Sequence, residues 1–412
     1  MATETIDTLV VGGGQAGLAM SEHLSSHGIA HIVLERSRIA ERWRIERWSS
    51  LVANGPAWHD RFPSKEFADC GPDDFPTKAS VVSYFEEFVD EMDVPIRCGI
   101  TVEKVTKAFG GNGFDVTTSQ GQIYARNVVA ATGPFQKPAM PPVVSNQDGL
   151  TQIHSTAYQR PDGLPEGAVL VVGAGSSGSQ IAEELRDSGR DVFLSVGAHD
   201  RPPRRYRNKD FVWWLGVLGK WQMKSPPVGA EHVTIAVSGA NGGQTVDFRR
   251  FAAKGITLLG MTKAFDDGTL SFAPDLARNI ADGDANYLSV LDEADAYVTR
   301  EGLDLPLDPT ARDIGPDPDC MTNPILELDL AARGIKTIIW ATGFTQDFSW
   351  LDVDVFDDAG KPSHEDGVTC EPGIYFLGLP WLSMRGSSFI WGVWVDAKNL
   401  AAHISQTGRR GE

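Results

Sequence analysis

Two glycine-rich turns in this 412-residue chain have the residue spacing that binds a dinucleotide pyrophosphate. The first turn contains Gly12, Gly14 and Gly17, and the second contains Gly173, Gly175 and Gly178. In such a turn the first glycine allows a tight bend, the second lets the backbone approach the phosphates, and the third lets the helix pack on the strand. Unpaired N–H groups at the start of the helix then bind the negative charge. A single turn of this kind is weak evidence, because it is also an ordinary strand-to-helix connection.

The sequences around the two turns repeat each other. Residues 9–35 read LVVGGGQAGLAMSEHLSSHGIAHIVLE, and residues 170–196 read LVVGAGSSGSQIAEELRDSGRDVFLSV. Each copy is an apolar run, a glycine turn, a helix-like stretch, a glycine stop and a second apolar run, which is the pattern of a βαβ unit. Two matching copies predict two bound dinucleotides.

The copies differ at the end of the second strand. The first copy ends in Glu35, followed by Arg36, and a carboxylate at this point hydrogen-bonds ribose hydroxyls. The second copy has Ser195 and Val196 there, so no acid repels a 2′-phosphate. This asymmetry predicts FAD in the first unit and NADPH in the second, with NADH as the alternative reductant.

A basic run, RPPRRYRNK from Arg201 to Lys209, follows the second unit in an otherwise acidic chain. Arg204 and Arg205 are our candidates for contacts to the 2′-phosphate. A solvated surface loop explains the same run equally well, because a cluster of charges is usually exposed.

The remaining pattern predicts an α/β fold with two Rossmann-type dinucleotide-binding domains, as in glutathione reductase, and a small antiparallel β insertion. We expect residues 1–160 and 331–412 to form a discontinuous FAD-binding domain, and residues 161–330 an NADPH-binding domain. Helical periodicity predicts helices over 81–92, 285–300 and 392–404. Short β-like runs predict strands over 100–105, 114–118, 123–124, 127–131, 233–237, 244–248, 255–260 and 336–340.

Composition excludes several classes of partner. The formal net charge of −18 argues against nucleic acid and anionic membranes, which would repel the protein. No run of eighteen apolar residues occurs, and the N-terminus lacks a signal peptide pattern. The four cysteines are scattered without a CxxC motif, so we expect neither a redox dithiol nor a metal site, and a reducing cytoplasm fits best. A homodimer is left open.

Over nearly its whole length the chain resembles the flavin-containing monooxygenase group, class B flavoprotein monooxygenases. It is most similar to the bacterial CzcO-like members, which are themselves similar to plant YUCCA-type enzymes. The residues that carry the resemblance are the two glycine turns, Ala-Thr-Gly at 131–133 and at 341–343, Glu41-Arg42-Trp43-Arg44, Trp48, Ser50, Leu51 and Asn54, the stretch from Ile153 to Tyr158, the stretch from Pro203 to Arg207, and GIYFLGLPWL at 373–382.

The resemblance implies the residues that bind the cofactors. Besides the glycines of the turns, Glu35, Ser195, Arg204 and Arg205, we assign to cofactor binding Gln15, Ala16, Arg36, Trp43, Arg44, Ser50, Thr132, Gly133, Ser176, Ser177, Thr342, Gly343 and Gly378. Asp347 is a weaker candidate for a polar contact near the flavin. Arg385 is expected to meet either the flavin or an anionic substrate.

Asn54 matches the group's asparagine near the reactive carbon of the flavin. Its amide can hydrogen-bond oxygen or nicotinamide without a titrating proton, so we assign it as the catalytic residue. The alternative is an ordinary turn, which Asn54-Gly55-Pro56 favours by itself.

One segment departs from the group's pattern. Gln147 and Gly149 precede His154 with one extra residue, so only the His-Ser-x-x-Tyr half of the signature is present. We expect His154 and Tyr158 to be framework residues rather than reactive groups.

Several aromatic residues are candidates for a substrate cavity. For Phe211, Trp213, Trp214, Trp381, Phe389, Trp391 and Trp394, core packing is the preferred interpretation and a hydrophobic substrate wall the alternative.

The resemblance implies a reaction in which NADPH reduces FAD, the reduced flavin reacts with dioxygen, and one oxygen atom passes to a small organic substrate. The substrate chemistry would be oxidation of nitrogen or sulfur, or Baeyer–Villiger insertion. Two alternatives remain. One is a flavin reductase without oxygen insertion, of the thioredoxin-reductase type, although that reaction needs a dithiol. The other is a nucleotide-binding redox sensor or transport regulator without turnover.

Overall fold

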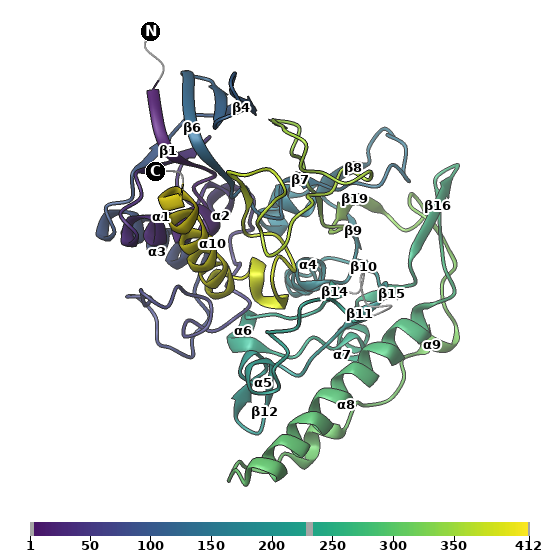
Figure 1. The fold of residues 1–412 in the computed structure, drawn as a ribbon. Coiled ribbons are helices and arrows are strands. Elements are labelled where there is room, and N and C mark those ends of the chain that lie inside the picture. The colour runs from purple at the N-terminus through teal and green to yellow at the C-terminus, as the bar shows by residue number, and fades with distance from the viewer. Residues whose placement is uncertain (1–3, 228–233, 411–412) are drawn as a thin grey trace.

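The computed structural model describes residues 4–227 and 234–410, which fold around one mixed sheet and one parallel sheet (Figure 1). The larger sheet has eight strands in the order β21-β4-β5-β6-β1-β2-β3, with β22 pairing on β6. Its strands are β1 (Glu4–Val11), β2 (His31–Glu35), β3 (Ile96–Cys98), β4 (Val102–Lys107), β5 (Phe114–Thr118), β6 (Gly121–Ala130), β21 (Leu351–Asp352) and β22 (Ile374–Phe376). Strands β4, β5 and β6 pair antiparallel, which confirms the expected insertion.

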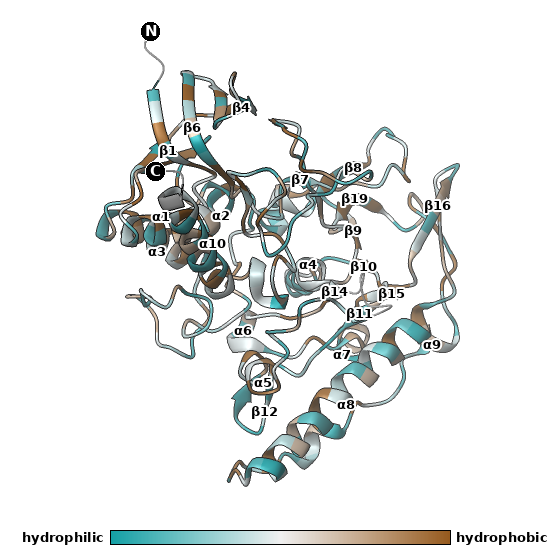
Figure 2. Cartoon of the chain, viewed as in Figure 1, coloured by the Kyte–Doolittle hydropathy of each residue, from teal (hydrophilic) through white to brown (hydrophobic). Residues whose placement is uncertain are grey.

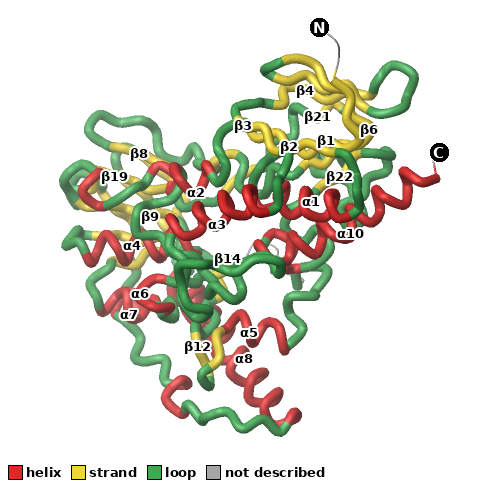
Figure 3. Tube along the Cα trace, turned by 90° about the vertical axis from the view of Figure 1, so that its left-hand side faces the viewer, coloured by secondary structure: helices red, strands yellow, loops and turns green. Residues whose placement is uncertain are grey.

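Helices cover the larger sheet on its βαβ side. They are α1 (Gln15–Ser26), α3 (Lys78–Glu91) and α10 (Ile390–Arg410), while the short α2 (Glu41–Ile45) contacts α3. Figure 3 shows α1, α3 and α10 beneath the strands, with α1 and α10 in direct contact. The apolar faces of α1 and α10 bury Leu18 and Leu400 against the strand residue Val10. Thr77 begins α3 by accepting a hydrogen bond from the Ser80 N–H.

The second sheet has five parallel strands in the order β15-β10-β9-β19-β8. They are β8 (Thr151–His154), β9 (Ala168–Val172), β10 (Val192–Ser195), β15 (Thr257–Leu259) and β19 (Ile335–Trp340). Helices α4 (Ser176–Asp187) and α7 (Phe248–Ala253) pack on one face. An antiparallel sheet of β16 (Thr262–Asp266), β17 (Thr269–Phe272) and β18 (Glu327–Asp329) supplies the apolar residues on the other face. Burial on both faces explains the uninterrupted apolar sequence of β9.

The other elements are short, except for α8. They are α5 (Phe211–Val217), α6 (Ala240–Gly243), α8 (Leu276–Glu301), α9 (Asp319–Thr322), the pairs β7 (Lys137–Pro138) with β20 (Phe344–Thr345), β11 (His199–Asp200) with β14 (Thr234–Ile235) and β12 (Arg205–Tyr206) with β13 (Lys209–Asp210), and the 3₁₀ turns 155–157, 161–163, 309–312 and 385–388. Figure 2 shows apolar and polar residues alternating along α8, as expected for a helix with one buried side.

The structure differs from the sequence predictions at three places. Strands β8 and β19 pair in the second sheet, although the expected boundaries assigned both to the FAD-binding domain. The two strands predicted over 123–124 and 127–131 are one strand, β6. The strand predicted over 244–248 is wrong, because Asp247 accepts the N–H groups of Arg249 and Arg250 and so begins helix α7. Of the strand predicted over 233–237, Thr234–Ile235 forms β14, and residue 233 lies outside the described residues. In the part of the chain that the structure describes, no helix combines the length and apolarity needed to cross a membrane.

Candidate active site

The first glycine turn connects β1 to α1 and has the geometry of a pyrophosphate site. Gly12 has a φ of +109°, and a Cβ atom there would lie 2.7 Å from the Ala131 carbonyl oxygen. A Cβ at Gly17 would lie 1.9 Å from the Gly12 carbonyl oxygen, so this helix residue must be glycine. A Cβ at Gly14 would meet nothing within 4 Å. The turn therefore packs tightly against Ala131 and leaves open space beside Gly14, where phosphates would contact the start of α1.

The second glycine turn, between β9 and α4, repeats this construction. Gly173 has a φ of +105°, and a Cβ there would lie 2.5 Å from the Ala341 carbonyl oxygen. A Cβ at Gly178 would lie 1.8 Å from the Gly173 carbonyl oxygen, whereas one at Gly175 would meet only Thr234, at 3.5 Å. The duplication seen in the sequence is thus a duplication of backbone packing.

A cleft of about 490 Å³ opens in front of the first turn. Ten residues assigned to cofactor binding line it: Gly12, Gly14, Gln15, Ala16, Glu35, Arg36, Trp43, Thr132, Gly133 and Gly378. The Gln15 amide donates to the Ser388 carbonyl oxygen (2.8 Å), which ties the start of α1 to the C-terminal segment. These residues come from separate stretches of the sequence, and the fold brings them to one site.

Glu35 is fixed at the end of β2. Its Oε2 accepts the Gly13 N–H (2.8 Å) and its Oε1 accepts the Ser37 N–H (2.9 Å). The half-buried carboxylate is therefore oriented beside the glycine turn, in the position expected for a ribose contact.

The cleft also contains residues that the sequence analysis did not assign. Gln136 donates to Thr132 Oγ1 (2.9 Å) and to the Gly133 carbonyl oxygen (2.8 Å), and its Oε1 accepts the Asp347 N–H (2.5 Å). Arg42 donates to the Gln136 carbonyl oxygen (2.9 Å). Arg47, Phe135 and Lys137 complete this wall. The sequence does contain a signal for Gln136, because this residue follows the first Ala-Thr-Gly by three positions and so lies near the predicted cofactor site.

Asp347 lines the same cleft, as its weaker assignment anticipated. An ion pair with Lys137 (2.5 Å) lowers the pKa of the Asp347 carboxyl to about 2. The group is therefore anionic at neutral pH. It follows the second Ala-Thr-Gly in sequence but serves the first cofactor cleft.

Several residues assigned to the cofactors have other partners and do not line this cleft. Arg44 forms an ion pair with Glu86, and Ser50 donates to Glu184 (2.5 Å). Thr342 donates to the Ala139 carbonyl oxygen, and the Gly343 carbonyl oxygen lies 2.9 Å from His154 Nε2. In each case a neighbouring element already satisfies the polar group.

The second unit satisfies its polar side chains internally as well. Ser195 Oγ, at the end of β10, donates to the Gly260 carbonyl oxygen (2.9 Å). Ser176 Oγ donates to the Ile235 carbonyl oxygen (3.0 Å), so β14 covers the first residue of α4. Ser177 is half-buried beside it.

Asn54 lies where the two units meet. Gln180, on α4, donates through Nε2 to both the Val237 carbonyl oxygen (3.1 Å) and Asn54 Oδ1 (2.9 Å). Because Val237 offers only an acceptor there, Gln180 must present its N–H₂ group, and Asn54 must accept through Oδ1. The Asn54 Nδ2 donors are then left for another partner. Asn54 does not line the cofactor cleft, and its catalytic role stays a prediction.

The solvated-loop interpretation fails for Arg201 and Arg204, whereas the contact of Arg205 with the 2′-phosphate stays a prediction. Arg204 is 2% exposed and forms an ion pair with Asp210, and it also donates to the Asn54 carbonyl oxygen (2.5 Å). Arg201 is equally buried, paired with Asp284. Arg205 is exposed. The run is therefore largely an internal ion-pair framework.

His154 and Tyr158 have the contacts of framework residues. The Thr156 N–H donates to His154 Nδ1 (3.2 Å), which leaves Nε2 as the donor to the Gly343 carbonyl oxygen. Burial lowers the pKa of His154, so the neutral ring is favoured. Tyr158 is fully buried and donates to Glu184 (2.7 Å), and burial raises its pKa.

The aromatic candidates separate into different clusters. Phe211 packs in one cluster with Trp221 and Trp391, and Phe389 lies 5.0 Å from the Trp221 ring. The other cluster contains Trp213 and Trp214 with Tyr206 and Tyr297, and Trp394 packs on the larger sheet. Only the first cluster includes an exposed aromatic residue, Phe389.

The four cysteines do not form a dithiol. Cys70, Cys98, Cys320 and Cys370 are all free. Burial raises the pKa of the Cys70, Cys98 and Cys320 thiols, which disfavours the reactive thiolate. No cluster of three or more metal-ligating side chains occurs among the described residues.

Two glycine turns of this kind, with a cleft beside the first, are typical of a flavin-dependent oxidoreductase that uses a pyridine nucleotide. Residues 9–216 match the model of the pyridine nucleotide-disulphide oxidoreductase family, and the chain belongs to this family. An uncharacterized CzcO-like oxidoreductase of Geobacillus kaustophilus (strain HTA426) is 34% identical over 403 residues, covering 97% of this chain and 98% of the relative.

More distant similarities point to flavin monooxygenases. The indole-3-pyruvate monooxygenase YUCCA1 of Oryza sativa subsp. japonica is 25% identical over 416 residues, covering 96% of this chain and 90% of the relative. The structure of a mutant flavin monooxygenase from Stenotrophomonas maltophilia superposes with a TM-score of 0.67 at 20% identity, covering 98% of this chain and 99% of that one. The expected resemblance and the fold class are thereby confirmed.

Proposed function

We propose that the protein is an FAD- and NADPH-dependent monooxygenase, which transfers one atom of dioxygen to a small organic molecule and reduces the other to water. The observation that carries the proposal is the contact between Asn54 and Gln180. This contact supports the proposal because a fixed, non-titrating donor between the two nucleotide units would be near both the hydride transfer and the oxygen chemistry.

FAD, when bound, would accept hydride from the nicotinamide and react with dioxygen. The turn at Gly14 would hold its pyrophosphate and Glu35 a ribose, while the Thr132–Gly133 segment and Gln136 would line its path. Gln180 keeps the Asn54 Nδ2 donors pointing away from its own amide. These donors would stabilise negative charge that develops on oxygen without giving up a proton.

NADPH rather than NADH is supported by the absence of an acid at Ser195 and Val196. Of the two arginines assigned to the 2′-phosphate, Arg205 is the exposed one and carries this part of the proposal. We therefore expect a preference for NADPH that is modest.

Disulfide reduction, which the family also includes by its description, has no support from the four separate thiols. A redox sensor would differ in its kinetics, with slow NADPH oxidation that no substrate accelerates.

The test is to supply NADPH and ¹⁸O₂ to the FAD-loaded protein with panels of thioethers, amines and ketones. One ¹⁸O atom in a product, with substrate-dependent oxygen consumption, would establish the class. Mixing the reduced protein with oxygenated buffer gives a second readout, a transient absorbance distinct from oxidised and reduced flavin. The proposal fails if no panel member accelerates oxygen consumption and no label enters a product.

Asn54→Ala should retain FAD and its rate of reduction by NADPH but lose about 10²-fold or more in product formation, because one donor to developing negative charge is removed. Oxygen should instead appear as hydrogen peroxide. The matched control is Asn112→Ala, on an exposed hairpin loop that does not line the cleft, which should leave both measurements unchanged. Equal loss of reduction rate and product in Asn54→Ala would assign Asn54 to nicotinamide binding alone.

A further inference from the structure

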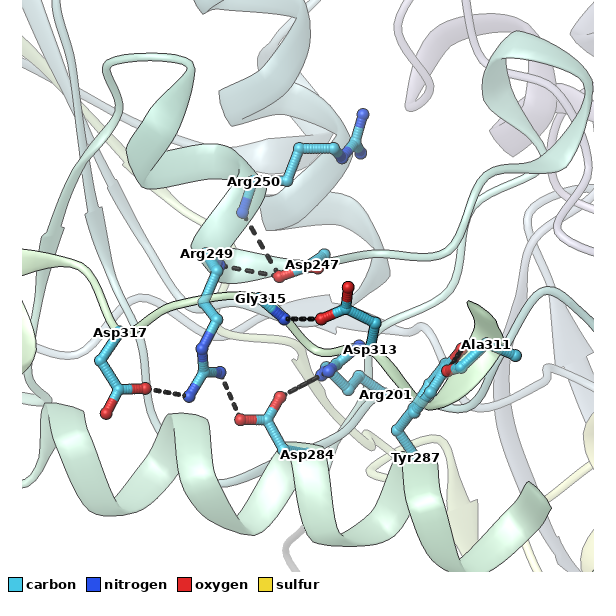
Figure 4. Close-up of polar contacts among 10 residues, drawn as sticks. All are labelled: Arg201, Asp247, Arg249, Arg250, Asp284, Tyr287, Ala311, Asp313, Gly315 and Asp317. Atoms are coloured by element: carbon cyan, nitrogen blue, oxygen red, sulfur yellow. Dashed lines mark hydrogen bonds and ion pairs between the residues drawn. The ribbon is translucent and has the colours of Figure 1, made fainter. Parts of the chain in front are cut away.

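A second cavity, of about 310 Å³, lies beside α8 and shares no lining residue with the cofactor cleft. Its lining residues are Arg201, Gln244, Thr245, Asp247, Arg250, Tyr287, Asp313 and Ile314. They come from the segment after β10, the start of α7, α8 and the loop after the 3₁₀ turn at 309–312 (Figure 4). No residue of the second glycine turn lines it, so it is also separate from the pyrophosphate position of the nicotinamide unit.

A buried guanidinium forms one side of this cavity. Arg201 is 2% exposed, and its Nε donates to Asp284 Oδ1 (2.9 Å), as does its Nη2 (2.5 Å). The guanidinium carbon lies 4.6 Å from the centre of the Tyr287 ring. Among the described residues, Arg201 Nη1 has no hydrogen-bond partner. The Arg201 side chain is buried and lines the cavity, so Nη1 can donate to an acceptor that enters it, ideally an anionic one.

Arg201 does not hold Asp284 alone. Arg249 also pairs with Asp284, and its second nitrogen pairs with Asp317 (2.6 Å), as Figure 4 shows. The charges of two guanidinium groups and two carboxylates therefore balance in the wall of the cavity. The network fixes the orientation of Arg201 and leaves its Nη1 able to bind a ligand.

Two carboxylates lie on the cavity with no basic side chain paired to them in the described part of the chain. Asp247 Oδ1 accepts the Arg249 N–H (2.8 Å) as a helix cap, and Asp313 Oδ1 accepts the Gly315 N–H (3.1 Å). Their second oxygens have no hydrogen-bond partner among the described residues. Arg250, the other cation of the lining, is already bound to Glu183 (3.0 Å) and Gln244 (2.9 Å). These carboxylates therefore attract a positive group.

We propose that this cavity is a binding site for a small zwitterion of the α-amino acid type. The carboxylate of the ligand would accept from Arg201 Nη1, and its ammonium group would lie between Asp247 and Asp313. Ile314 and the edge of Tyr287 offer an apolar surface for its side chain. A phosphate or another simple anion fits less well, because the two free carboxylates would repel it.

The site is connected to the proposed active site through the backbone of the basic run. Thr245, in the cavity, accepts the Arg204 N–H through Oγ1 (2.9 Å), and the Arg204 side chain donates to the Asn54 carbonyl oxygen (2.5 Å). Arg201, which would bind the ligand, precedes Arg204 by three residues, and Arg204 contacts Asn54. The inference itself does not depend on the proposed function, because binding is measured without turnover.

The experiment is calorimetric titration of the FAD-loaded protein with each of the proteinogenic L-amino acids, without nicotinamide. We expect at least one to bind at a 1:1 ratio with a Kd below about 10 mM, and its N-acetyl derivative and its amide not to bind measurably, because each lacks one of the two charges. Asp313→Asn keeps the acceptor for the Gly315 N–H and should weaken the amino acid at least about tenfold. Asp304→Asn, an equal change of charge at an exposed position outside the lining, should leave the affinity unchanged.

Either of two results would overturn the inference. One is the absence of saturable binding by any amino acid to a protein that retains FAD. The other is binding of adenosine 2′-monophosphate that Asp313→Asn strengthens, since loss of a carboxylate favours an anion and would assign the cavity to the nucleotide instead.

Discussion

The two nucleotide units share the same backbone packing and differ in what surrounds it. In both, the third glycine of the turn lies against the carbonyl oxygen of the first, at 1.9 Å and 1.8 Å for an added Cβ. At the strand ends they diverge, because Glu35 remains at the cleft while Ser195 is buried against Gly260. The comparison teaches that the glycine spacing encodes a turn, while the identity of the nucleotide depends on residues that the turn does not specify.

The largest effect expected from this comparison is on folding. Gly17→Ala or Gly178→Ala places a methyl group inside contact distance of a backbone oxygen that cannot move without separating helix and strand. Overpacking of this kind should cost about 3 kcal/mol or more, enough for insoluble or unfolded protein. Near-ultraviolet circular dichroism and solubility measure it. Gly14→Ala is the matched control, since its methyl group meets nothing within 4 Å. A soluble, native-like Gly17→Ala protein would contradict the packing argument.

The next effect separates two adjacent arginines of the basic run. Arg204→Gln leaves Asp210, whose side chain is only 10% exposed, without its charge partner and should lower the free energy of unfolding by about 3 kcal/mol. Arg205→Gln, at an exposed position, should change it by less than about 0.5 kcal/mol. Chemical denaturation compares the two. If Arg205 binds the 2′-phosphate, its variant should raise the KM for NADPH severalfold and leave that for NADH unchanged. Equal stability of the two variants would mean that the Arg204–Asp210 pair is not formed.

A third pair of variants tests which nucleotide each turn binds. Gly14→Ala should fold but place a methyl group where the FAD pyrophosphate approaches, so the purified protein should lose FAD affinity by at least about tenfold, or about 1.4 kcal/mol. Gly175→Ala should retain FAD and instead weaken the nicotinamide nucleotide by a similar factor. Flavin absorbance of the purified protein and nicotinamide titration measure the two losses. The reverse assignment would exchange these outcomes, with Gly175→Ala colourless and Gly14→Ala yellow.

Features formed by residues close together in the sequence could be predicted, whereas most contacts between distant residues could not. The turns, their helices and Glu35 were predictable because each βαβ unit is local and the pattern occurs twice. The Gln136–Asp347 contact joins residues far apart in sequence, and so do those of Asn54 with Gln180 and of Arg204 with Asn54. No periodicity encodes such pairs. The burial of Arg204 has a different cause, because its carboxylate partner Asp210 is close in sequence and an arginine-rich run still indicates an exposed surface.

The domain boundary shows the same limit. The expected boundary at residue 331 assigns strand β19 to the FAD-binding domain, and an Ala-Thr-Gly follows β19 as one follows β6. In the structure β19 pairs with β9, yet the segment after it crosses back to the first cleft, where Asp347 lies. The two Ala-Thr-Gly turns are thus alike in sequence but not in position, because Thr132 lines the cleft and Thr342 bonds to Ala139.

The smallest expected effect tests whether Asp347 belongs to the first cleft. Its folded pKa of about 2 lies below the ordinary value of 3.8, so the Lys137 ion pair stabilises the protein above pH 4, and this contribution is lost as the pH falls from about 4 to about 2. Lys137 is largely exposed, so solvent screens the pair and its contribution should stay below about 1 kcal/mol. Asp347→Asn should therefore lower the free energy of unfolding slightly at pH 7 and match the wild type near pH 2, as measured by denaturant titration at both values. If FAD binds over this ion pair, FAD affinity at pH 7 should fall together with that stability. A loss of stability without any change in FAD affinity would mean that Asp347 only stabilises the loop that follows β19.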